Sequence, residues 1–249
     1  MTVTTEQLGS ARMVVWDRRA RLNAWTVETI EAIADAIETA GRDELVRSII
    51  VRGAGEHFSS GDDLHAALAA DADDWAATVA AFQRLTRVTL AASVPVLAAI
   101  DGVCIGGALE FAAGCDMRLA TDRSRFGTPE VGIGLVATNA GTLLLPEVLG
   151  ETAARELMLT GKLRDFAWAR EHGFLTEVCA PERFEERIAA RAATFDGTSR
   201  TAVAATKAML NARLGSLVDA AMQREERTCV ELFGQPDARA ALKAFAARG

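Results

Sequence analysis

The sequence predicts an α/β fold whose C-terminal region is helical. In the first two-thirds of the chain, short apolar runs alternate with segments of helical periodicity, as in proteins that pack strands and helices in layers. The last third shows a helical pattern throughout. Half of the 249 residues are apolar, so the chain can bury a large core. We expect a core over residues 1–195 and a helical C-terminal region over residues 196–249.

Four apolar runs in the first half have the length and composition of strands, and they cover residues 12–17, 46–51, 94–100 and 103–105. A helix is expected between the first two runs. Thr26 is a suitable N-cap, isoleucines then recur on one helical face, and Gly41 is well placed to end the helix. A longer Ala-rich helical segment is expected over residues 68–92, with a break among the aspartates at 71–74.

The second half is expected to contain a loop over residues 132–141, where three glycines occur. Short helices are expected at 151–159 and 164–171, followed by an extended segment at 174–178. The C-terminal helices are then predicted over residues 182–195, 201–214, 217–233 and 237–247.

The chain is acidic, with 34 acidic against 27 basic residues and a net charge of −7. This balance argues against a general nucleic-acid-binding protein, so an anionic ligand must be held by a local basic group. The N-terminus lacks a basic-then-apolar signal, and no apolar run approaches the ~18 residues of a membrane span. We therefore expect a cytoplasmic protein without a membrane partner. The cysteines form no C-x-x-C pair and the histidines lack ligand spacing, so no metal site is predicted.

Two strand–glycine–helix junctions carry the chemistry that the sequence predicts. At the second junction, Gly106 and Gly107 open a helix directly after a strand, and Glu110 lies one turn further on. Glycines allow a ligand to approach the backbone, and the first N–H groups of a helix face that ligand together with the positive end of the helix dipole. The first junction repeats this logic after residue 51, with a helix starting near residues 60–63. Such places can bind an oxyanion and move a proton beside it.

Three segments in this order resemble the crotonase superfamily, the enoyl-CoA hydratase/isomerase family. They are Phe58 to Leu64 (Phe-Ser-Ser-Gly-Asp-Asp-Leu), residues 101–116 with their Gly-Gly-Ala-Leu-Glu, and Arg125 to Glu130. The resemblance covers residues 14–178 and also includes Leu22-Asn23-Ala24. It implies a crotonase-like spiral of repeated ββα units and a helical C-terminal region that covers the active site and builds a homotrimer or a dimer of trimers. It also implies an acyl-CoA thioester substrate and no metal or redox cofactor.

The resemblance also implies which residues form the site. The backbone N–H groups of Asp62 and Gly107 would grip the thioester oxygen. Because the reaction places enolate charge on that oxygen, losing one such donor typically costs roughly 2.7–4 kcal/mol of barrier. Glu110 would activate water for attack at the β-carbon, and Glu130 would deliver a proton to the α-carbon. The predicted substrate and CoA contacts are Arg21, Ser60, Gly61, Asp63, Leu64, Gly106, Pro129 and Thr138.

Two places depart from the family pattern. Asp62 stands where a small residue is usual; we expect its side chain to cap the following helix, with Ser60 as the rival cap, since an inward carboxylate would oppose the enolate. Residues 134–142 lack the usual Pro-Gly-rich sequence, which favours a substrate other than a plain short enoyl chain. Thr138 and Asn139 either hydrogen-bond an oxygenated acyl group or satisfy the turn, and the sequence leaves both open.

The leading hypothesis is therefore an enoyl-CoA hydratase. One alternative is an enoyl-CoA isomerase that relies mainly on Glu130, and another is a non-catalytic acyl-CoA-binding protein. A nucleophilic hydrolase fits poorly, because no Gly-x-Ser-x-Gly occurs. The basic turn at residues 18–21 is either a solvated loop or a contact for the CoA phosphates.

Overall fold

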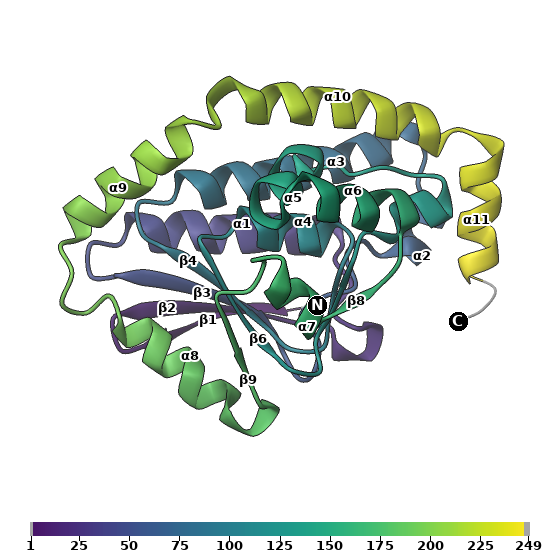
Figure 1. Cartoon of the computed structure of the whole chain (residues 1–249). Helices are drawn as coiled ribbons and strands as arrows, with labels where there is room; N and C mark the ends of the chain where they lie inside the picture. The colour runs from purple at the N-terminus through teal and green to yellow at the C-terminus, as the bar shows by residue number, and fades with distance from the viewer. Residues whose placement is uncertain (1, 247–249) are drawn as a thin grey trace.

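The central layer of the molecule is a six-stranded sheet in the order β1-β2-β3-β4-β6-β9, which Figure 1 shows below most of the helices and above α8. The computed structural model describes residues 2–246. β1 pairs antiparallel with β2, and each further neighbour in this sheet is parallel. The strands are Thr2–Leu8 (β1), Ala11–Asp17 (β2), Ser48–Gly53 (β3), Val96–Ile100 (β4), Met117–Thr121 (β6) and Glu177–Cys179 (β9).

A second, three-stranded sheet has the order β5-β7-β8 and consists of Val103–Ile105 (β5), Arg125–Gly127 (β7) and Arg164–Asp165 (β8). From β4 to β7, strands that follow each other in the chain enter the two sheets in turn. β4 joins the large sheet, β5 joins the small one, and helix α4 (Gly107–Gly114) follows; β6 and β7 repeat this step before the next helices. This repetition of two strands and a helix confirms the predicted spiral of ββα units.

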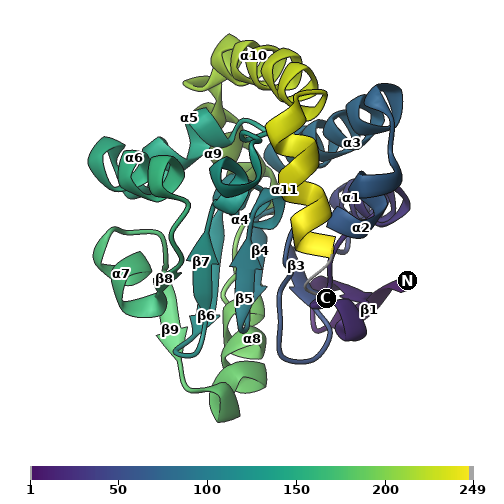
Figure 2. The same cartoon turned by 90° about the vertical axis from the view of Figure 1, so that its right-hand side faces the viewer.

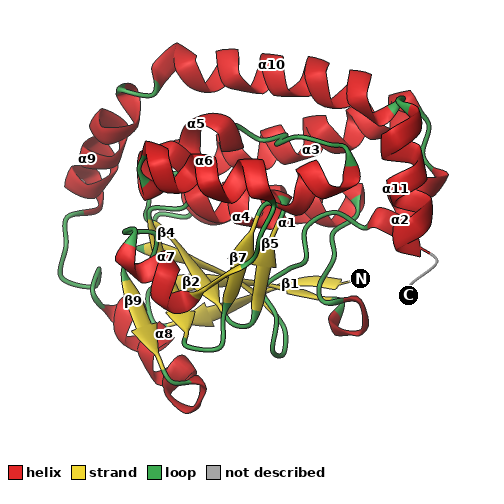
Figure 3. Ribbon diagram, turned by 45° about the vertical axis from the view of Figure 1, so that its right-hand side comes forward, coloured by secondary structure: helices red, strands yellow, loops and turns green. Residues whose placement is uncertain are grey.

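Helices cover both faces of the large sheet, and Figure 3 shows most of them on one side with α8 on the other. The remaining helices of the core are Val27–Arg42 (α1), Leu64–Ala69 (α2), Ala72–Ala91 (α3), Gly141–Leu149 (α5), Glu151–Thr160 (α6), Phe166–Glu171 (α7) and Phe184–Ala193 (α8). Short 3-10 helices occur at Arg19–Arg21 (η1), Pro129–Ile133 (η2) and Pro181–Arg183 (η3).

The central strands are buried on both faces, which explains their continuous apolar sequences. In β3, Ile49 and Val51 pack into the main core below α1 and α3, whereas Ile50 between them packs against Phe184 of α8 on the other face. All five residues of β4 are buried in the same alternating way. Burying apolar side chains on both faces is the expected behaviour of parallel strands between helical layers.

The C-terminal region consists of Arg200–Ala212 (α9), Gly215–Phe233 (α10) and Pro236–Ala246 (α11). In Figure 1, α9 and α10 form an arc above the helical layer, and α11 descends at its far end. Figure 2 shows α11 in front of the core, where it packs on α2. α10 also packs on α3 and α5, and α11 reaches α2, the helix that follows the first glycine junction. Assembly through these helices stays a prediction.

Some elements differ from the sequence-based expectation. β6 was not predicted, because its apolar run is interrupted by Arg118. That side chain is buried and donates hydrogen bonds to the carbonyls of Ala112 and Cys115 at 3.1 and 2.7 Å. β1 and β7 were also missed, and the segment predicted as a helix from residue 164 begins with β8. The expected last helix ends at Ala246 in the structure, and its predicted final residue, 247, lies outside the described part of the chain.

Between residues 2 and 246, no helix combines the length and apolar composition needed to span a membrane.

Candidate active site

The first glycine turn is fixed by the chain that precedes α1. The N–H of Trp25 donates to the carbonyl of Gly61 at 2.8 Å, and the N–H of Asp63 donates to the carbonyl of Trp25 at 2.9 Å. On the other side of the turn, the N–H of Ser60 donates to the carbonyl of Leu22 at 3.0 Å. Leu22 itself has a left-handed φ of 50°. Asp62 lies between Gly61 and Asp63, and its own N–H takes part in none of these bonds.

The second glycine turn lies directly against the first. Gly61 has a φ of +80°, and a Cβ on it would lie 2.9 Å from the carbonyl oxygen of Ile105 and 3.3 Å from the nitrogen of Gly107. Gly107 begins α4, and a Cβ there would lie 2.7 Å from the ring of Phe82. Only glycine fits this contact without displacing buried atoms. The two turns thus bring the N–H groups of Asp62 and Gly107 into one neighbourhood.

Glu110 follows in the same helix, and its carboxyl is almost completely buried, with 1% of the residue exposed. Its Oε2 accepts hydrogen bonds from the N–H groups of Thr138 and Asn139, each at 3.1 Å. A Cβ on Gly141 would lie 2.5 Å from the same oxygen, so the glycine allows the loop to close over the carboxyl. The other oxygen, Oε1, is buried and has no hydrogen-bond partner among residues 2–246.

Glu130 lies in η2 and faces a small pocket of about 50 Å³, which we call the Glu130 pocket. One of its oxygens, Oε2, is buried without a hydrogen-bond partner in the described chain, and the other lies near Gly106, 3.1 Å from where a Cβ on that glycine would be. The lining of the pocket comprises Ser60, Asp62, Leu64, Trp75, Gly106, Pro129, Glu130, Ile133, Leu135, Val136 and Thr138. Glu110 is not part of this lining.

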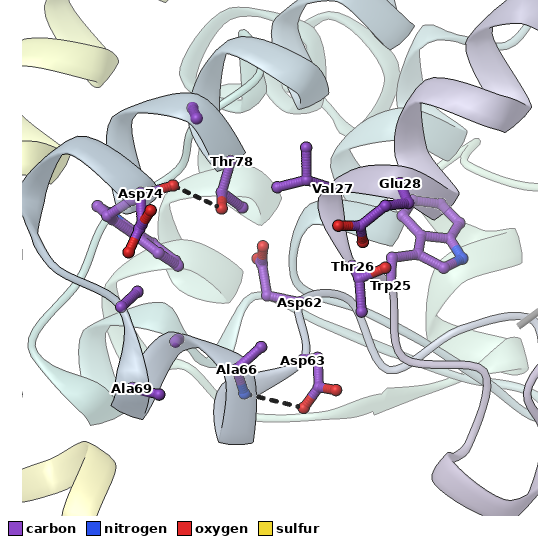
Figure 4. A pocket seen from close by; sticks show the side chains of 14 residues that line it. Trp25, Thr26, Val27, Glu28, Asp62, Asp63, Ala66, Ala69, Asp74 and Thr78 are labelled. Carbon is purple, nitrogen blue, oxygen red and sulfur yellow. Dashed lines mark hydrogen bonds between the residues drawn. The ribbon is translucent and has the colours of Figure 1, made fainter.

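Asp62 also borders a second and larger cavity of about 540 Å³, the Asp62 cavity, which lies between α1, α2 and α3. Figure 4 shows the Asp62 side chain pointing into this space, with Val27 and Thr78 beyond it. Alanines of α2 and α3 make up much of the wall, which leaves room for a ligand. Oδ1 of Asp62 is buried and has no hydrogen-bond partner within residues 2–246.

The expectation that Asp62 or Ser60 caps α2 is wrong. Asp63 is the N-cap, because one of its carboxylate oxygens accepts from the N–H groups of His65 and Ala66 at 3.0 and 3.3 Å. Its other oxygen pairs with Arg18 at 2.5 Å. Asp63 points toward the helix end and its neighbour toward the cavities, since the turn at Gly61 sets the two side chains in different directions. The inward orientation of Asp62 is thus the one that the structure shows.

Burial sets the acid–base properties of these groups. It raises the pKa of Glu110 well above its ordinary value, and the nearby charges of Glu130 and Glu225 raise it further. Burial also raises the pKa of Glu130 to about 7, with a further contribution from the charge of Asp62. The pKa of Asp62 is likewise raised to about 7, by burial first and then by the charge of Asp63. Three carboxyl groups therefore hold protons near neutral pH, as expected where like charges share a water-poor site.

The sequence and the fold of this chain have counterparts among known proteins. The family model described as Enoyl-CoA hydratase/isomerase matches residues 9–249. The chain belongs to the enoyl-CoA hydratase/isomerase family. A crotonyl-CoA hydratase from Syntrophomonas wolfei is 29% identical over 92% of this chain and 88% of that protein. A short-chain-enoyl-CoA hydratase from Clostridium acetobutylicum is 28% identical over 98% of this chain and 94% of its own length. The crystal structure of an enoyl-CoA hydratase from Mycobacterium avium subsp. paratuberculosis superposes with a TM-score of 0.90 at 27% identity, covering 97% of each chain.

The structure brings most of the residues expected from the family resemblance into one place. Five of the eight predicted contact residues line the Glu130 pocket, namely Ser60, Leu64, Gly106, Pro129 and Thr138. Gly61 shapes the first turn, and Asp63 borders the Asp62 cavity while it caps α2. Arg21 lies apart from both cavities on the surface, where its guanidinium is 3.3 Å from the His65 ring. Its contact with CoA stays a prediction.

Thr138 and Asn139 both contribute to the interior of the site. Their N–H groups bind Glu110, and the Asn139 side chain donates to the carbonyl of Gly107 at 3.3 Å. Asn139 is fully buried, so it belongs to the packing of the turn. Thr138 lines the Glu130 pocket, where its side chain can meet an acyl group. Asn139 therefore satisfies the turn, and a hydrogen bond from Thr138 to an oxygenated acyl group stays a prediction.

Sequence reasoning missed Glu225, a buried residue of α10. Its carboxylate accepts hydrogen bonds from the N–H groups of Ala140 and Thr142 at 2.7 and 2.8 Å. It stands in a run of charged residues, Arg224 to Arg227, that resembles an exposed helical face. The signal that could have found it is its spacing of three from Met222 and four from Cys229, both buried, which places it on the inner face of the helix.

Ser59 and His57 do not form a nucleophile–base pair in the structure. The Ser59 hydroxyl donates to the carbonyl of Asn23 at 2.8 Å, while Nδ1 of His57 accepts from the N–H of Val103 at 3.3 Å. The serine and the histidine thus have separate structural partners. No group of three or more His, Cys, Asp or Glu side chains within residues 2–246 is arranged to hold a metal ion.

Proposed function

We propose that the protein is an enoyl-CoA hydratase, which adds water across the 2,3 double bond of an enoyl-CoA thioester. The observation that carries this proposal is the pair of glutamates beside the two glycine turns, Glu110 and Glu130, each of which has one buried oxygen without a partner in the described chain. Hydration requires two proton transfers, and the site contains two carboxyls to perform them. Family membership supports the coarser assignment to this group of enzymes.

The backbone supplies the first part of the mechanism. When water attacks the β-carbon, the electrons of the double bond move toward the thioester oxygen and create an enolate. The N–H groups of Asp62 and Gly107 would stabilise that charge more than they stabilise the uncharged substrate, which lowers the barrier. Because backbone donors are fixed by the two turns, they need no rearrangement during the reaction.

The carboxyls supply the second part. Oε1 of Glu110 would take a proton from water as its oxygen bonds to the β-carbon, and Glu130 would give a proton to the α-carbon. A pKa of about 7 suits Glu130, since a group with this value can both give and take a proton near neutral pH. Glu110 holds its proton to a higher pH in the free protein, so this role as a base predicts that activity increases with pH as Glu110 ionises.

Replacement of each glutamate by glutamine tests the proposal. Loss of the conjugated-thioester absorbance of a panel of enoyl-CoA substrates measures hydration. Glu110→Gln and Glu130→Gln should each reduce kcat/KM by roughly 10²–10⁴-fold, the usual contribution of general acid–base catalysis. A kcat/KM that falls across the pH range in which Glu110 ionises would assign the acid role to Glu110 and overturn its role as a base.

Double-bond isomerisation is the second candidate, favoured by one observation. Glu130 lines the Glu130 pocket, whereas Glu110 lies behind the pocket wall. A single pocket-facing carboxyl could move a proton from one carbon of the acyl chain to another. In that case Glu110→Gln would retain isomerase activity while Glu130→Gln would lose it. Tight binding of a CoA thioester without any turnover would instead support a non-catalytic acyl-CoA-binding protein.

Asp62 and its cavity suggest the class of acyl group. A carboxyl with an unpartnered buried oxygen is costly beside a plain alkyl chain, and a hydrogen-bond donor on the substrate would remove that cost. We propose an acyl group that carries a hydroxyl or another donor beyond the double bond. Hydroxylated enoyl-CoAs should then react with at least tenfold higher kcat/KM than alkyl analogues of equal length, and Asp62→Ala should remove this preference. Equal values in the wild type would reject the proposal.

We also propose that the protein assembles as a homotrimer or a dimer of trimers. Three large apolar side chains of α9 and α10 are exposed in the single chain, Met209, Leu210 and Leu217, at 70%, 64% and 55%. Exposed apolar residues on neighbouring helices are suited to a subunit contact. Sedimentation of the purified protein as a monomer would contradict the assembly.

A further inference from the structure

Glu225 is a buried carboxylate that the mechanism above does not use. It lies on α10 in the C-terminal region, with 4% of the residue exposed. Its Oε2 accepts from the N–H of Ala140 at 2.7 Å, and its Oε1 accepts from the N–H and the hydroxyl of Thr142 at 2.8 and 2.5 Å. Within residues 2–246 it forms no ion pair, so these three donors compensate its charge. A buried carboxylate in this position would be unfavourable without them.

The loop that Glu225 binds is the same loop that binds Glu110. The N–H groups of Thr138 and Asn139 point to Glu110, and the next N–H group along the chain, that of Ala140, points to Glu225. Two buried carboxylates thus divide the N–H groups of residues 138–142 between them. A displacement of this loop on one side would change the hydrogen bonds on the other.

The loop holds a backbone conformation that needs support. Ala140 has a left-handed φ of +67°, which is unfavourable for an alanine by roughly 1–2 kcal/mol. Gln83 of α3 adds a second link, since its side-chain amide donates to the carbonyls of Thr138 at 3.2 Å and Met222 at 3.0 Å. Met222 precedes Glu225 by about one turn of α10, so the helix is joined to the loop at two places.

We propose that Glu225 is a positioning residue that fixes the 138–142 loop and, through it, the carboxyl of Glu110. The C-terminal helix α10 thereby becomes part of the catalytic apparatus without touching the substrate. The inference rests on the proposed function in so far as it gives Glu110 a catalytic role.

Glu225 also acts on Glu110 through its charge. The charged groups that affect Glu110 are Glu130 from η2 and Glu225 from α10, and both raise its pKa. On its own helix, Glu225 has Arg224 beside it, which favours the charged form. Removing the charge of Glu225 should therefore lower the pKa of Glu110. A residue that merely stabilised the fold would not produce this change.

The test compares Glu225→Gln with Glu231→Gln, an exposed glutamate on the same helix. Glutamine has nearly the same shape, but a backbone N–H group faces each oxygen of Glu225, so an amide NH₂ at either position must lose one hydrogen bond. We expect Glu225→Gln to lower kcat for enoyl-CoA hydration by 10–100-fold with KM within threefold of wild type. The pH at which kcat reaches half its maximum should move to lower pH by at least 0.5. Glu231→Gln should match the wild type.

A second measurement is independent of catalysis. Hydrogen–deuterium exchange in a peptide that spans residues 134–143 reports on the loop, and exchange should be at least tenfold faster in Glu225→Gln than in Glu231→Gln. Thr142→Val removes one donor at a more exposed position and should increase exchange by a smaller factor. Unchanged exchange together with unchanged kcat and pH profile would overturn the inference. Faster exchange in a protein that hydrates no enoyl-CoA would sustain the positioning role and reject the proposed function.

Discussion

Four carboxyl groups surround the candidate site, two on buried residues and two on partly exposed ones, and they form two pairs in different surroundings. Asp62 and Glu130 line the Glu130 pocket, and one oxygen of each has no hydrogen-bond partner within residues 2–246. Glu110 and Glu225 lie in the packed interior and accept hydrogen bonds from the 138–142 loop. We call these the pocket pair and the interior pair. The comparison shows that burial alone does not define a carboxyl's role, since its hydrogen-bond donors decide how firmly it is held.

The two pairs also differ in the effects that set the pKa of their carboxyl groups. Burial raises the pKa of all four groups, which favours the protonated form. Within the interior pair, N–H donors act against this effect and favour the carboxylates. Both members of the pocket pair have a pKa of about 7. The pocket pair can therefore exchange protons near neutral pH, whereas Glu110, whose pKa is raised well above its ordinary value, ionises at higher pH.

The largest expected effect comes from disturbing the interior pair without changing its charges. Gly141→Ala would place a Cβ 2.5 Å from the Glu110 carboxylate, closer than any real contact, so the carboxyl or the loop must move. We expect kcat for enoyl-CoA hydration to fall by at least about 10²-fold, since displacing a catalytic group by ~1 Å has this effect. Steady-state kinetics with the absorbance assay would measure it.

Gly132→Ala is the matched control, because a Cβ there meets no atom within 4 Å. This variant should retain the wild-type kcat. Binding of a CoA thioester to Gly141→Ala, measured by calorimetry, should stay within threefold of wild type, because the pocket pair is untouched. Full activity in Gly141→Ala would show that the interior pair has no influence on the chemistry.

The sequence was sufficient for the fold class and for several of the central strands, and the reason is local. Each of the central strands, such as β4, is a continuous apolar run, and the glycines at 106 and 107 are required by contacts that a Cβ would fill. Contacts between residues far apart in the chain could not be predicted from such local patterns. Glu225 reaches its loop from 85 residues further along the chain, and only the folded structure shows that contact.

The directions in which neighbouring side chains point could not be predicted from the sequence either. Asp62 and Asp63 both precede a helix, and either carboxylate has the chemistry of an N-cap. The backbone of the turn decides between them, because the left-handed Gly61 directs Asp62 to the cavities and leaves Asp63 at the helix end. Composition and spacing contain no information about this choice.

A smaller effect, on stability, is expected from the pocket pair. The folded protein keeps the Asp62 proton up to about pH 7, whereas the unfolded chain releases it near pH 4. The folded state therefore binds more protons in this window, and its stability decreases as pH rises through it. Asp62→Asn removes this loss, so the variant should gain stability relative to wild type by roughly 1–3 kcal/mol between pH 5 and pH 8. Urea denaturation at both pH values measures the change, and a constant difference would contradict the raised pKa.

The smallest effect is expected for the neighbouring Asp63, whose contribution to the stability changes with pH in the opposite direction. Although burial alone would raise its pKa, the ion pair with Arg18 and the two N–H donors of α2 lower it. A lowered pKa stabilises the folded state above pH 4, and that stability is lost as pH falls. Asp63→Asn should therefore cost about 1 kcal/mol at pH 7 and less near pH 4, as for the loss of a helix cap with a partly buried ion pair. The same denaturation experiments should thus give opposite pH slopes for two adjacent aspartates, and slopes of equal sign would refute the assignment of one carboxylate to the cavity and the other to the helix.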